Sequence, residues 1–195
     1  MNEEFEKDFL EVERKFEVDK AIDLNVLKSE STDIFKIYQG YFVDTDGHYK
    51  RIRLQTSLIT GKMQSVVCEK THVGTFKGVP LLKEIEIFHP YDWGVALINE
   101  KNISCIEKTR YVIPLEKYTM EVDKFENLVD EFKDWISAEV EFKSEKELIE
   151  FEKVKLPQFI LKECTGDKKY SNANMSKYID KSIVHPFEKK VKHKM

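Results

Sequence analysis

The sequence is poor in cysteine and contains no long apolar run. Its 195 residues include only three cysteines, Cys68, Cys105 and Cys164, which lie far apart. An odd number of distant cysteines fits neither a disulfide framework nor a zinc site, so we expect reduced thiols. No stretch approaches the roughly 20 apolar residues of a membrane-spanning helix. Acidic residues precede the first apolar run, so we expect no signal peptide and a cytoplasmic protein.

The sequence also lacks a large excess of charge of either sign. The formal net charge is −4, although 35% of the residues are charged. This balance excludes wholesale nucleic-acid binding and confines any basic site to a local cluster. A hydrophobic fraction of 41% excludes a disordered chain. Because the chain shows neither an internal repeat nor a long linker, we expect residues 1–195 to form one domain.

Apolar and polar residues alternate along most of the chain, which is the period of a β-strand. Turn residues such as Asp46-Gly47 and Thr60-Gly61 indicate short connections, and these join antiparallel neighbours. We therefore expect a mainly β (α+β) fold, in which antiparallel strands close into an eight-stranded barrel. The predicted strands cover residues 10–18, 34–43, 48–56, 63–70, 82–89, 104–113, 118–125 and 137–143.

Helical signals lie between and after these strands, and we expect the helices to pack outside the barrel. Ser144 and Glu147 have the spacing of a capping box before an apolar stretch. The predicted helices cover residues 23–31, residues 92–101 after Pro90, the segment between Ser144 and Pro157, and residues 172–181, and a basic tail follows over residues 186–195.

Like charges recur two residues apart on one face of the predicted strands. Two like charges about 7 Å apart repel by about 0.6 kcal/mol even in water. A solvated outer face is the simplest explanation of a charged strand face. However, the opposite face of most of these strands is apolar, so we expect the charges to line the barrel interior. The pairs are Glu11 with Glu13, Arg51 with Arg53, Glu84 with Glu86, Lys108 with Arg110, Glu121 with Asp123, and Glu139 with Glu141.

Separate acidic and basic sets are suited to a metal ion and a polyanion. Carboxylates such as Glu11, Glu13, Glu139 and Glu141 are hard oxygen ligands of the kind that Mg²⁺ or Mn²⁺ prefers. The histidines offer no softer site, because His48 and His72 are expected in turns and His185 in the tail. The bases would neutralise a chain of phosphates, the arginines by bidentate contact. The candidate phosphate-binding residues are Lys15, Arg51, Arg53, Lys70 and Arg110.

The charged segments resemble, in order, the motifs of a known family. Residues 11–16 (EVERKF) match the ExExK signature of the CYTH superfamily, also called the triphosphate tunnel metalloenzymes. The resemblance covers about residues 10–178. It departs at residues 68–71, where a glycine is missing, and at Lys169, where the family more often has arginine. Further segments similar to the family are QGY at 39–41, RxR at 51–53, EIEI at 84–87, EKTRY at 107–111, EVD at 121–123, paired acids at 139–141 and a DxRYxN-like segment at 167–172.

The resemblance implies a tunnel that holds a triphosphate and one or two divalent cations. By analogy, Glu11, Glu13 and Glu141 would hold the metal, with Asp123 and Glu139 close by and with Glu84, Glu86 and Glu121 as supporting acids. The phosphates would be held by Lys15, Arg51, Arg53, Lys70, Arg110 and Lys169.

Members of the family that hydrolyse inorganic tripolyphosphate pair a tyrosine with a lysine, and the matching residues here are Tyr41 and Lys108. An ammonium near the phenol would favour the phenolate, which could accept a proton from the attacking water. The alternative is that Tyr41 only packs at the tunnel mouth.

The leading hypothesis is therefore hydrolysis of a small-molecule triphosphate with Mg²⁺ or Mn²⁺, converting inorganic tripolyphosphate into pyrophosphate and phosphate. The same site could serve an adenylate cyclase or a thiamine triphosphatase, since both act on organic triphosphates. A module that only binds polyphosphate or a nucleotide is a third alternative. We expect neither a nucleic-acid nor a membrane partner, and a homodimer stays an open alternative.

Overall fold

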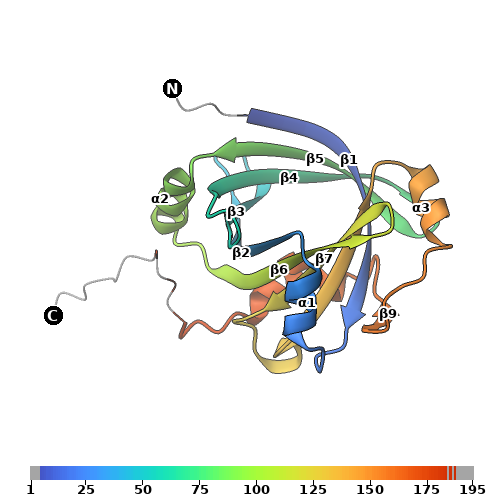
Figure 1. Cartoon of the computed structure of the whole chain (residues 1–195). Helices are drawn as coiled ribbons and strands as arrows, with labels where there is room; N and C mark the ends of the chain where they lie inside the picture. Colours follow the sequence, from blue (N-terminus) through green and yellow to red (C-terminus); the bar gives the residue numbers. More distant parts are fainter. Residues whose placement is uncertain (1–4, 184, 186, 188–195) are drawn as a thin grey trace.

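The computed structural model describes residues 5–183, 185 and 187, with side chains from Val12 onward. Strands form about half of this part of the chain, and the helices lie around them (Figure 1). The strands are β1 (Phe5–Val18), β2 (Asp33–Val43), β3 (Tyr49–Ser57), β4 (Met63–Phe76), β5 (Val79–His89), β6 (Cys105–Leu115), β7 (Tyr118–Phe125), β8 (Ile136–Phe142) and β9 (Ile160–Glu163).

The strands form one antiparallel sheet that closes on itself. Its order is β5-β4-β3-β2-β6-β7-β8-β1, and β1 pairs back with β5. The length of β1 makes this closure possible, because residues 5–12 pair with β5 and residues 12–17 pair with β8. The short strand β9 adds to β1 near Phe16, beyond the segment that pairs with β5. The expected mainly β fold with a closed eight-stranded antiparallel barrel is confirmed.

All eight predicted strands are present, with differences at their ends. The β4–β5 hairpin is longer than predicted, because β4 continues to Phe76 and the turn is Lys77-Gly78. Both turn residues have positive φ, as a two-residue hairpin turn requires. His72 therefore lies in β4 and not in a turn. The ninth strand was not predicted, because Ile160–Glu163 is short, mostly exposed and without alternation.

Four α-helices lie in the described part of the chain, as predicted. They are α1 (Leu24–Glu30), α2 (Tyr91–Lys101), α3 (Glu145–Phe151) and α4 (Asn172–Met175), and short 3₁₀ turns occupy Asp130–Phe132, Lys168–Tyr170 and Ser176–Tyr178. The capping box forms, since Ser144 Oγ accepts from the backbone N–H of Glu147. The last helix is shorter than predicted, because it passes into a 3₁₀ turn at Ser176. None of the helices within the described residues is long and apolar enough to cross a membrane.

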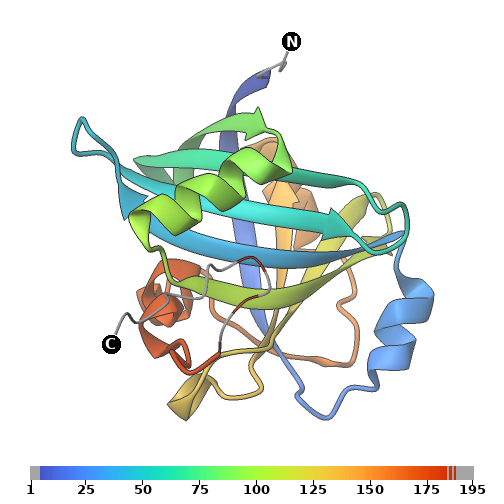
Figure 2. The ribbon, with the colours of Figure 1, turned by 90° about the vertical axis from the view of Figure 1, so that its left-hand side faces the viewer.

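The apolar faces of the strands point outward and pack under the helices. Ile52 and Leu54 of β3 are fully buried beneath α2, where they contact Ile98. Figure 2 shows α2 lying along the outer face of β3 and β4. A second outer cluster places Phe151 of α3 against Phe16 of β1. The polar faces of the same strands are therefore left to the barrel interior.

The third outer cluster involves the C-terminal part of the described chain. Trp135 and Phe132 pack there with Met175 of α4. His185, which was expected in the tail, is only 3% exposed and packs edge-on against Tyr38. Of the predicted basic tail, only Phe187 lies within the described residues, and its ring also contacts Tyr38.

Candidate functional site

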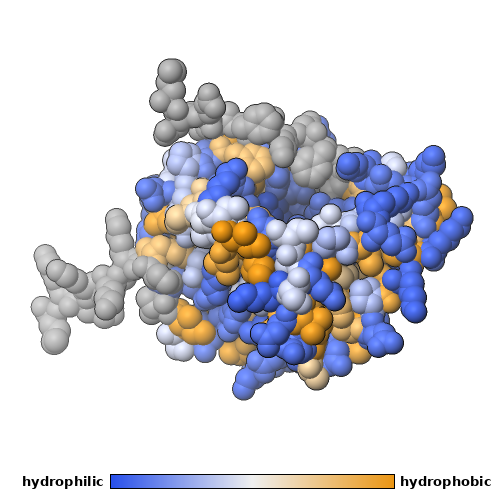
Figure 3. Space-filling model, viewed as in Figure 1, coloured by the Kyte–Doolittle hydropathy of each residue, from blue (hydrophilic) through white to orange (hydrophobic). Residues whose placement is uncertain are grey.

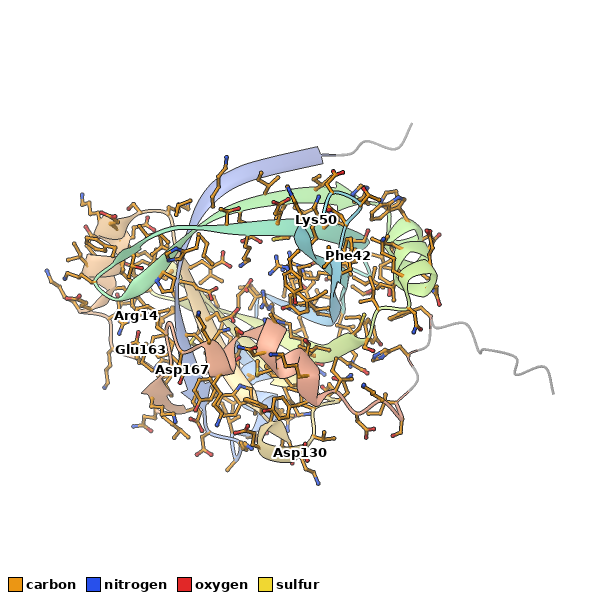
Figure 4. All side chains as sticks on the ribbon, turned by 180° about the vertical axis from the view of Figure 1, so that it is seen from behind. Arg14, Phe42, Lys50, Asp130, Glu163 and Asp167 are labelled. Carbon is orange, nitrogen blue, oxygen red and sulfur yellow. The ribbon has the colours of Figure 1, made fainter. Side chains whose placement is uncertain are left out.

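The polar faces of the strands line a cavity of about 360 Å³ inside the barrel. This volume lies in the range of small-molecule sites. Ser171, Asn172 and Ala173 cover one end, and Figure 4 shows this segment in front of the interior when the molecule is seen from behind. Seen from the opposite side, the surface is largely hydrophilic (Figure 3). The charged lining consists of Glu13, Lys15, Arg51, Arg53, Lys70, Glu84, Glu86, Arg110, Glu121, Glu139 and Glu141.

The arginines of β3 and the glutamates of β8 lie on opposite walls of the cavity. In the closed order of eight strands, β3 lies four steps from β8 and therefore faces it across the interior. Arg51 and Arg53 line the cavity from β3, and Glu139 and Glu141 line it from β8. The alternation of β3 and β8 puts these side chains on the inner face, since every second residue of a strand points the same way. The cavity thus has one wall suited to an anion and one suited to a cation.

Glu13 and Glu141 form the acidic pair that most lacks compensation. They lie directly opposite each other in the β1–β8 register, where like charges destabilise a sheet. The pKa of Glu141 is raised to about 7, because the surrounding protein disfavours its charge and because Glu121 and Glu13 repel it. Water in the open cavity reaches Glu141 and screens part of this repulsion. Among the described side chains, no base forms an ion pair with Glu13 or Glu141.

This pair fits a small divalent cation, although it is not a complete metal cage. Among the described residues, no group of three or more His, Cys, Asp or Glu side chains could hold a metal ion by itself. Mg²⁺ is usually bound by one or two carboxylates together with water and substrate phosphates. Two carboxylates that repel each other, with a basic wall across the cavity, satisfy that requirement. Glu11, a third predicted metal ligand, lies outside the residues whose side chains are described.

The basic wall is held in place by the acids of β5. Arg51 Nη2 lies 2.7 Å from Glu84 Oε1, and Arg53 Nη2 lies 3.3 Å from Glu86 Oε1. Lys70 also contacts Glu84, at 3.2 Å. Burial and the repulsion of Arg51 lower the pKa of Arg53. Arg53 Nε is buried and has no hydrogen-bond partner among the described residues, so an anion in the cavity would complete the coordination of this side chain.

Arg110 is bound more tightly by acids than the arginines of β3. Its Nε and Nη2 each lie 2.7 Å from the carboxylate of Asp123, which is a bidentate pair. Its Nη1 contacts Glu121, and its Nη2 lies 3.3 Å from Glu139. Lys108 Nζ lies 2.5 Å from the same Asp123 carboxylate. Arg110 lines the cavity, whereas Lys108 and Asp123, each 1% exposed, lie behind the lining.

The network around Arg110 shifts the pKa values of its carboxylates. Burial alone would raise the pKa of Asp123, but Arg110 and Lys108 outweigh it and lower this pKa. Lys15, whose Nζ lies 2.6 Å from Glu139 Oε1, and Arg110 likewise lower the pKa of Glu139 despite its burial. These two carboxylates, predicted near the metal, are therefore neutralised by bases in the structure. Their metal-binding role stays a prediction.

The predicted pair of Tyr41 and Lys108 is not formed. Lys108 is opposite Ile37 in the β2–β6 register, four residues and about 13 Å along β2 from Tyr41. Burial raises the pKa of Tyr41 to about 12, against the opposing effect of Arg51. Gln39 Nε2 donates to Tyr41 Oη at 2.6 Å. The expected lowering of the Tyr41 pKa was therefore wrong, because burial outweighs the nearby cations. Tyr41 lines the cavity as a protonated phenol.

Lys169 also lies away from the cavity. It forms an ion pair with Glu131 on the surface, and its side chain is 48% exposed. The 3₁₀ turn Lys168–Tyr170 directs this side chain outward. A positive charge at this position of the motif was therefore not enough to predict that the side chain enters the cavity. Its phosphate-binding role stays a prediction. The other predicted bases, Lys15, Arg51, Arg53, Lys70 and Arg110, are brought together at the cavity.

Three of the lining residues that lie on strands were not predicted as site residues from the sequence. Cys68 donates its thiol hydrogen to Glu84 Oε1 at 2.7 Å, and burial raises its pKa to about 12. Tyr49 stacks on Tyr41 with ring centroids 5.6 Å apart, and Leu82 adds an apolar contact. Cys68 could have been found, because it shares a strand face with Lys70. Tyr49 follows a turn, so its pairing with Tyr41 depends on the β2–β3 register.

Comparison with known proteins finds no protein family and no curated relative that matches the chain. Similar solved structures include the PH1819 protein of Pyrococcus horikoshii, with 21% identity, a TM-score of 0.48, and coverage of 72% of this chain and 82% of that one. A conserved hypothetical protein of Pyrococcus furiosus has 17% identity and a TM-score of 0.45, with 77% and 94% covered.

A proposed adenylate cyclase from Bacillus halodurans has 13% identity and a TM-score of 0.42, and the alignment covers 77% of this chain and 94% of that one. Likenesses at this level assign no activity to this chain. The closed antiparallel barrel seen here is compatible with the CYTH superfamily that the sequence motifs resemble.

Proposed function

We propose that the chain hydrolyses a triphosphate in the barrel cavity with the help of Mg²⁺ or Mn²⁺. The observation that carries this proposal is the uncompensated Glu13–Glu141 pair, which β1 and β8 bring together on the wall that faces the arginines of β3. A cation would neutralise this acidic pair, and its charge would then favour a polyanion bound beside it. The polyanion would share the arginines of β3 with Glu84 and Glu86, which already balance their charge.

Phosphate oxygens would be bound by the basic residues that already face the cavity. Arg51, Arg53 and Lys70 would exchange part of their contacts with Glu84 and Glu86 for contacts with the substrate. This exchange keeps each guanidinium paired throughout, so binding does not require an arginine to lose all its partners. Arginine also suits phosphate because its planar fork can bind two oxygens at once.

Glu13 and Glu141 would hold the metal ion at the acidic wall. When bound, the metal supplies a positive charge that neutralises the charge developing on phosphate oxygens during phosphoryl transfer. The contribution of the protein is to bring the carboxylates of β1 and β8 to the same register position. Lys15, paired with Glu139 two residues further along β1, fixes the other end of this acidic wall.

Tyr41 would act as a hydrogen-bond donor to the substrate and not as a base. A phenol with a pKa of about 12 keeps its proton near neutral pH. Because Gln39 Nε2 donates to Tyr41 Oη, the phenolic hydrogen remains available for another acceptor. A phosphate oxygen in the cavity that Tyr41 lines is such an acceptor.

Inorganic tripolyphosphate contains the whole reacting group and is the substrate that the sequence favours. Cyclisation of a nucleoside triphosphate would use the same walls but would release pyrophosphate and a cyclic nucleotide. A cytoplasmic location agrees with the three buried cysteines, none of which forms a disulfide within the described residues, but it stays a prediction.

The decisive experiment compares phosphate release by the wild type and by Glu13→Gln. With tripolyphosphate and Mg²⁺ or Mn²⁺, we expect a loss of about 100-fold or more, because the metal contributes several kcal/mol and each 1.36 kcal/mol is tenfold. Glu100→Gln, on the exposed face of α2, is the matched control. Full activity of Glu13→Gln, or turnover that continues in a chelator, would contradict the proposal. Cyclic nucleotide formation from ATP would replace hydrolysis by cyclisation.

A further inference from the structure

One buried side-chain oxygen at the barrel cavity has no partner among the described residues. Asn172, the first residue of α4, lines the cavity of about 360 Å³. Its Oδ1 is buried and accepts no hydrogen bond from the described part of the chain. Buried polar atoms in folded proteins are nearly always paired, because an unpaired one loses its bonds to water without replacement. The oxygen of Asn172 therefore indicates a ligand that the cavity takes up.

The side chains next to Asn172 are used to hold the local fold. Ser171 Oγ donates to the carbonyl of Lys168 at 2.9 Å and accepts from the backbone N–H of Asn174 at 3.2 Å. Asn174 Nδ2 donates to the same carbonyl of Lys168 at 2.5 Å. These contacts start the short helix and fix the backbone of Asn172 at the cavity, while its amide oxygen takes no part in them.

The segment that carries Asn172 is attached to the acidic wall of the cavity. Lys15 Nζ, on β1, donates to the carbonyl of Tyr170 at 3.3 Å. The ring of Tyr170 stacks on Trp135, directly before β8, with ring centroids 5.1 Å apart. Met175 of α4 packs in the same cluster as Trp135. The two strands that carry the acidic pair thus also hold the segment, which lies across one end of the barrel (Figure 4).

The segment enters the cavity at the place where Glu13 lies. A second cavity of about 480 Å³ adjoins the first, and Glu13 and Ser171 line both. These two residues therefore lie at the boundary between the two spaces. Asn172 follows Ser171 directly and lines only the first cavity. Its side chain is thus close to the acidic pair and separated from the arginines of β3 by the cavity.

The chemistry of an amide oxygen distinguishes between the ligands that this cavity suits. A phosphate chain offers acceptor oxygens, so it cannot satisfy another acceptor. A divalent cation can, because Mg²⁺ and Mn²⁺ prefer oxygen ligands, including carbonyl oxygens.

We infer that Asn172 is a third protein ligand of the cation held by Glu13 and Glu141, with Oδ1 as the binding atom. A neutral amide adds an oxygen ligand without adding to the repulsion between the two carboxylates. It also explains why the oxygen is left unpaired by the surrounding protein. This inference rests on the proposed function, because it concerns the same cation.

The test measures binding of Mn²⁺ alone to the metal-free protein at pH 8, from the electron paramagnetic resonance signal of the free ion. Asn172→Ala should weaken Mn²⁺ binding about tenfold or more, because loss of a group that supports a bound metal costs about 10- to 100-fold in affinity. Asn172→Asp should bind Mn²⁺ at least as tightly as the wild type, because it restores an oxygen ligand. A purely structural role of the amide would not produce this recovery.

Two further variants localise the effect to the acidic pair. Glu13→Gln should weaken Mn²⁺ binding, and Glu13→Gln/Asn172→Asp should bind Mn²⁺ about tenfold more tightly than Glu13→Gln, because the new carboxylate replaces the lost one at the same ion. Lys177→Ala is the control, since Lys177 is exposed, follows in the same segment and lines neither cavity. It should bind Mn²⁺ as the wild type does. If Asn172→Ala does not fold, the Glu13→Gln pair of variants decides alone.

Several results would overturn the inference. They are an affinity of Asn172→Ala within about twofold of the wild type, equal losses in Asn172→Ala and Asn172→Asp, and a wild type that binds no Mn²⁺. An amide that instead donates its Nδ2 to a phosphate would show unchanged Mn²⁺ binding in Asn172→Ala and weaker tripolyphosphate binding in Asn172→Asp, which also overturns it.

Phosphate release measured in parallel separates this inference from the proposed function. If the wild type releases no phosphate with either metal, the proposed hydrolysis fails, and the Mn²⁺ affinities still decide whether Asn172 is a ligand. If the wild type releases phosphate and Asn172→Ala binds Mn²⁺ normally, the inference fails and the hydrolysis stands.

Discussion

Burial decides the protonation of the residues in and behind the cavity as much as their charged neighbours do. Tyr41 experiences three nearby cations, yet burial raises its pKa to about 12. Lys108 touches a carboxylate, yet burial and the adjacent Arg110 lower its pKa to about 8. Inside a barrel, the cost of removing a charge from water therefore has to be weighed before any partner is considered.

Replacement of Tyr41 by phenylalanine tests whether this tyrosine donates a hydrogen bond. Tyr41→Phe should raise KM about tenfold and leave kcat within about threefold, because one hydrogen bond to a charged phosphate is worth about 1.5 kcal/mol. The measurement is steady-state hydrolysis of tripolyphosphate between pH 6 and 9. The control is Tyr111→Phe on the outer face of β6. A large fall in kcat without a change in KM would instead indicate that Tyr41 acts on the transition state and not on the bound substrate.

Asp123 is expected to be the most sensitive residue of the buried network. Asp123→Ala should lower the free energy of unfolding by about 3–5 kcal/mol, because it leaves Lys108 and Arg110 buried without their shared partner. Urea unfolding measures this change. The double variant Lys108→Met/Asp123→Ala removes one of the stranded charges and should recover part of the loss. A cost below about 1 kcal/mol for the single variant would show that the network is not energetically important.

At the scale of elements, the contact between α2 and the barrel depends on a glycine. Gly94 is buried where the helix crosses β3 and β4, and a Cβ there would lie 2.5 Å from Ser65 Cβ and 2.6 Å from Leu54 Cδ2. Both neighbours are buried, so neither can move without displacing the helix or the sheet. The helix therefore lies as close to the sheet as its backbone allows.

Gly94→Ala should accordingly destabilise the fold by about 1–3 kcal/mol, although alanine favours helices. Thermal unfolding of the variant and of the wild type measures the effect. Gly74→Ala is the matched control, since its Cβ would meet only Leu81 Cδ1 at 3.8 Å. Equal melting temperatures for Gly94→Ala and the wild type would mean that α2 can shift outward at no cost.

Alternation predicted the strands well because the two faces of this sheet meet very different surroundings. Ile52 and Leu54 face helices while Arg51 and Arg53 face the cavity, so the period-two signal is strong in β3. The signal fades in the outer part of β4, where His72 and Val73 are both exposed. It is also absent from β9, which exists because Phe16 offers a free strand edge beyond β5.

The sequence predicted some of the residues that line the cavity, but not the ion pairs that these residues form. Strand faces identified Glu13, Arg51 and Glu141 as interior residues. Strand faces could not show that Arg110 forms an ion pair with Asp123, because this contact depends on the β6–β7 register. Lys169 lay outside any strand, so no alternation constrained its direction.

At the scale of the whole molecule, most charged side chains that line the cavity form ion pairs with one another. The acidic pair of Glu13 and Glu141 is the exception. Arg51, Arg53 and Lys70 are paired with β5, and Lys15 is paired with β8. Folding therefore does not require a bound polyanion to neutralise the basic wall. The acidic pair is different, because its repulsion is present whenever both carboxylates are ionised and no cation is bound.

The stability of the metal-free protein should consequently depend on the ionisation of Glu141. Its pKa is about 7 in the folded protein and 4.5 as its ordinary value, so between these pH values the folded state binds more protons than the unfolded state. Stability contributed by this group is thus lost as pH rises from about 4.5 to 7. We expect the melting temperature in a chelator to fall across this window more steeply for the wild type than for Glu141→Gln. Glu100→Gln, on the outer helix α2, should behave as the wild type.

Added Mg²⁺ should reverse this loss above pH 7, because a ligand that binds only the folded state stabilises it. It should have little effect at pH 5, where protonated Glu141 offers the metal one carboxylate less, and little effect at any pH in Glu141→Gln. The melting temperatures of the wild type and Glu141→Gln could instead change in the same way with pH and with added Mg²⁺. That result would show that Glu13 and Glu141 do not repel each other measurably and do not bind a cation. The placement of the metal between β1 and β8 would then have to be abandoned.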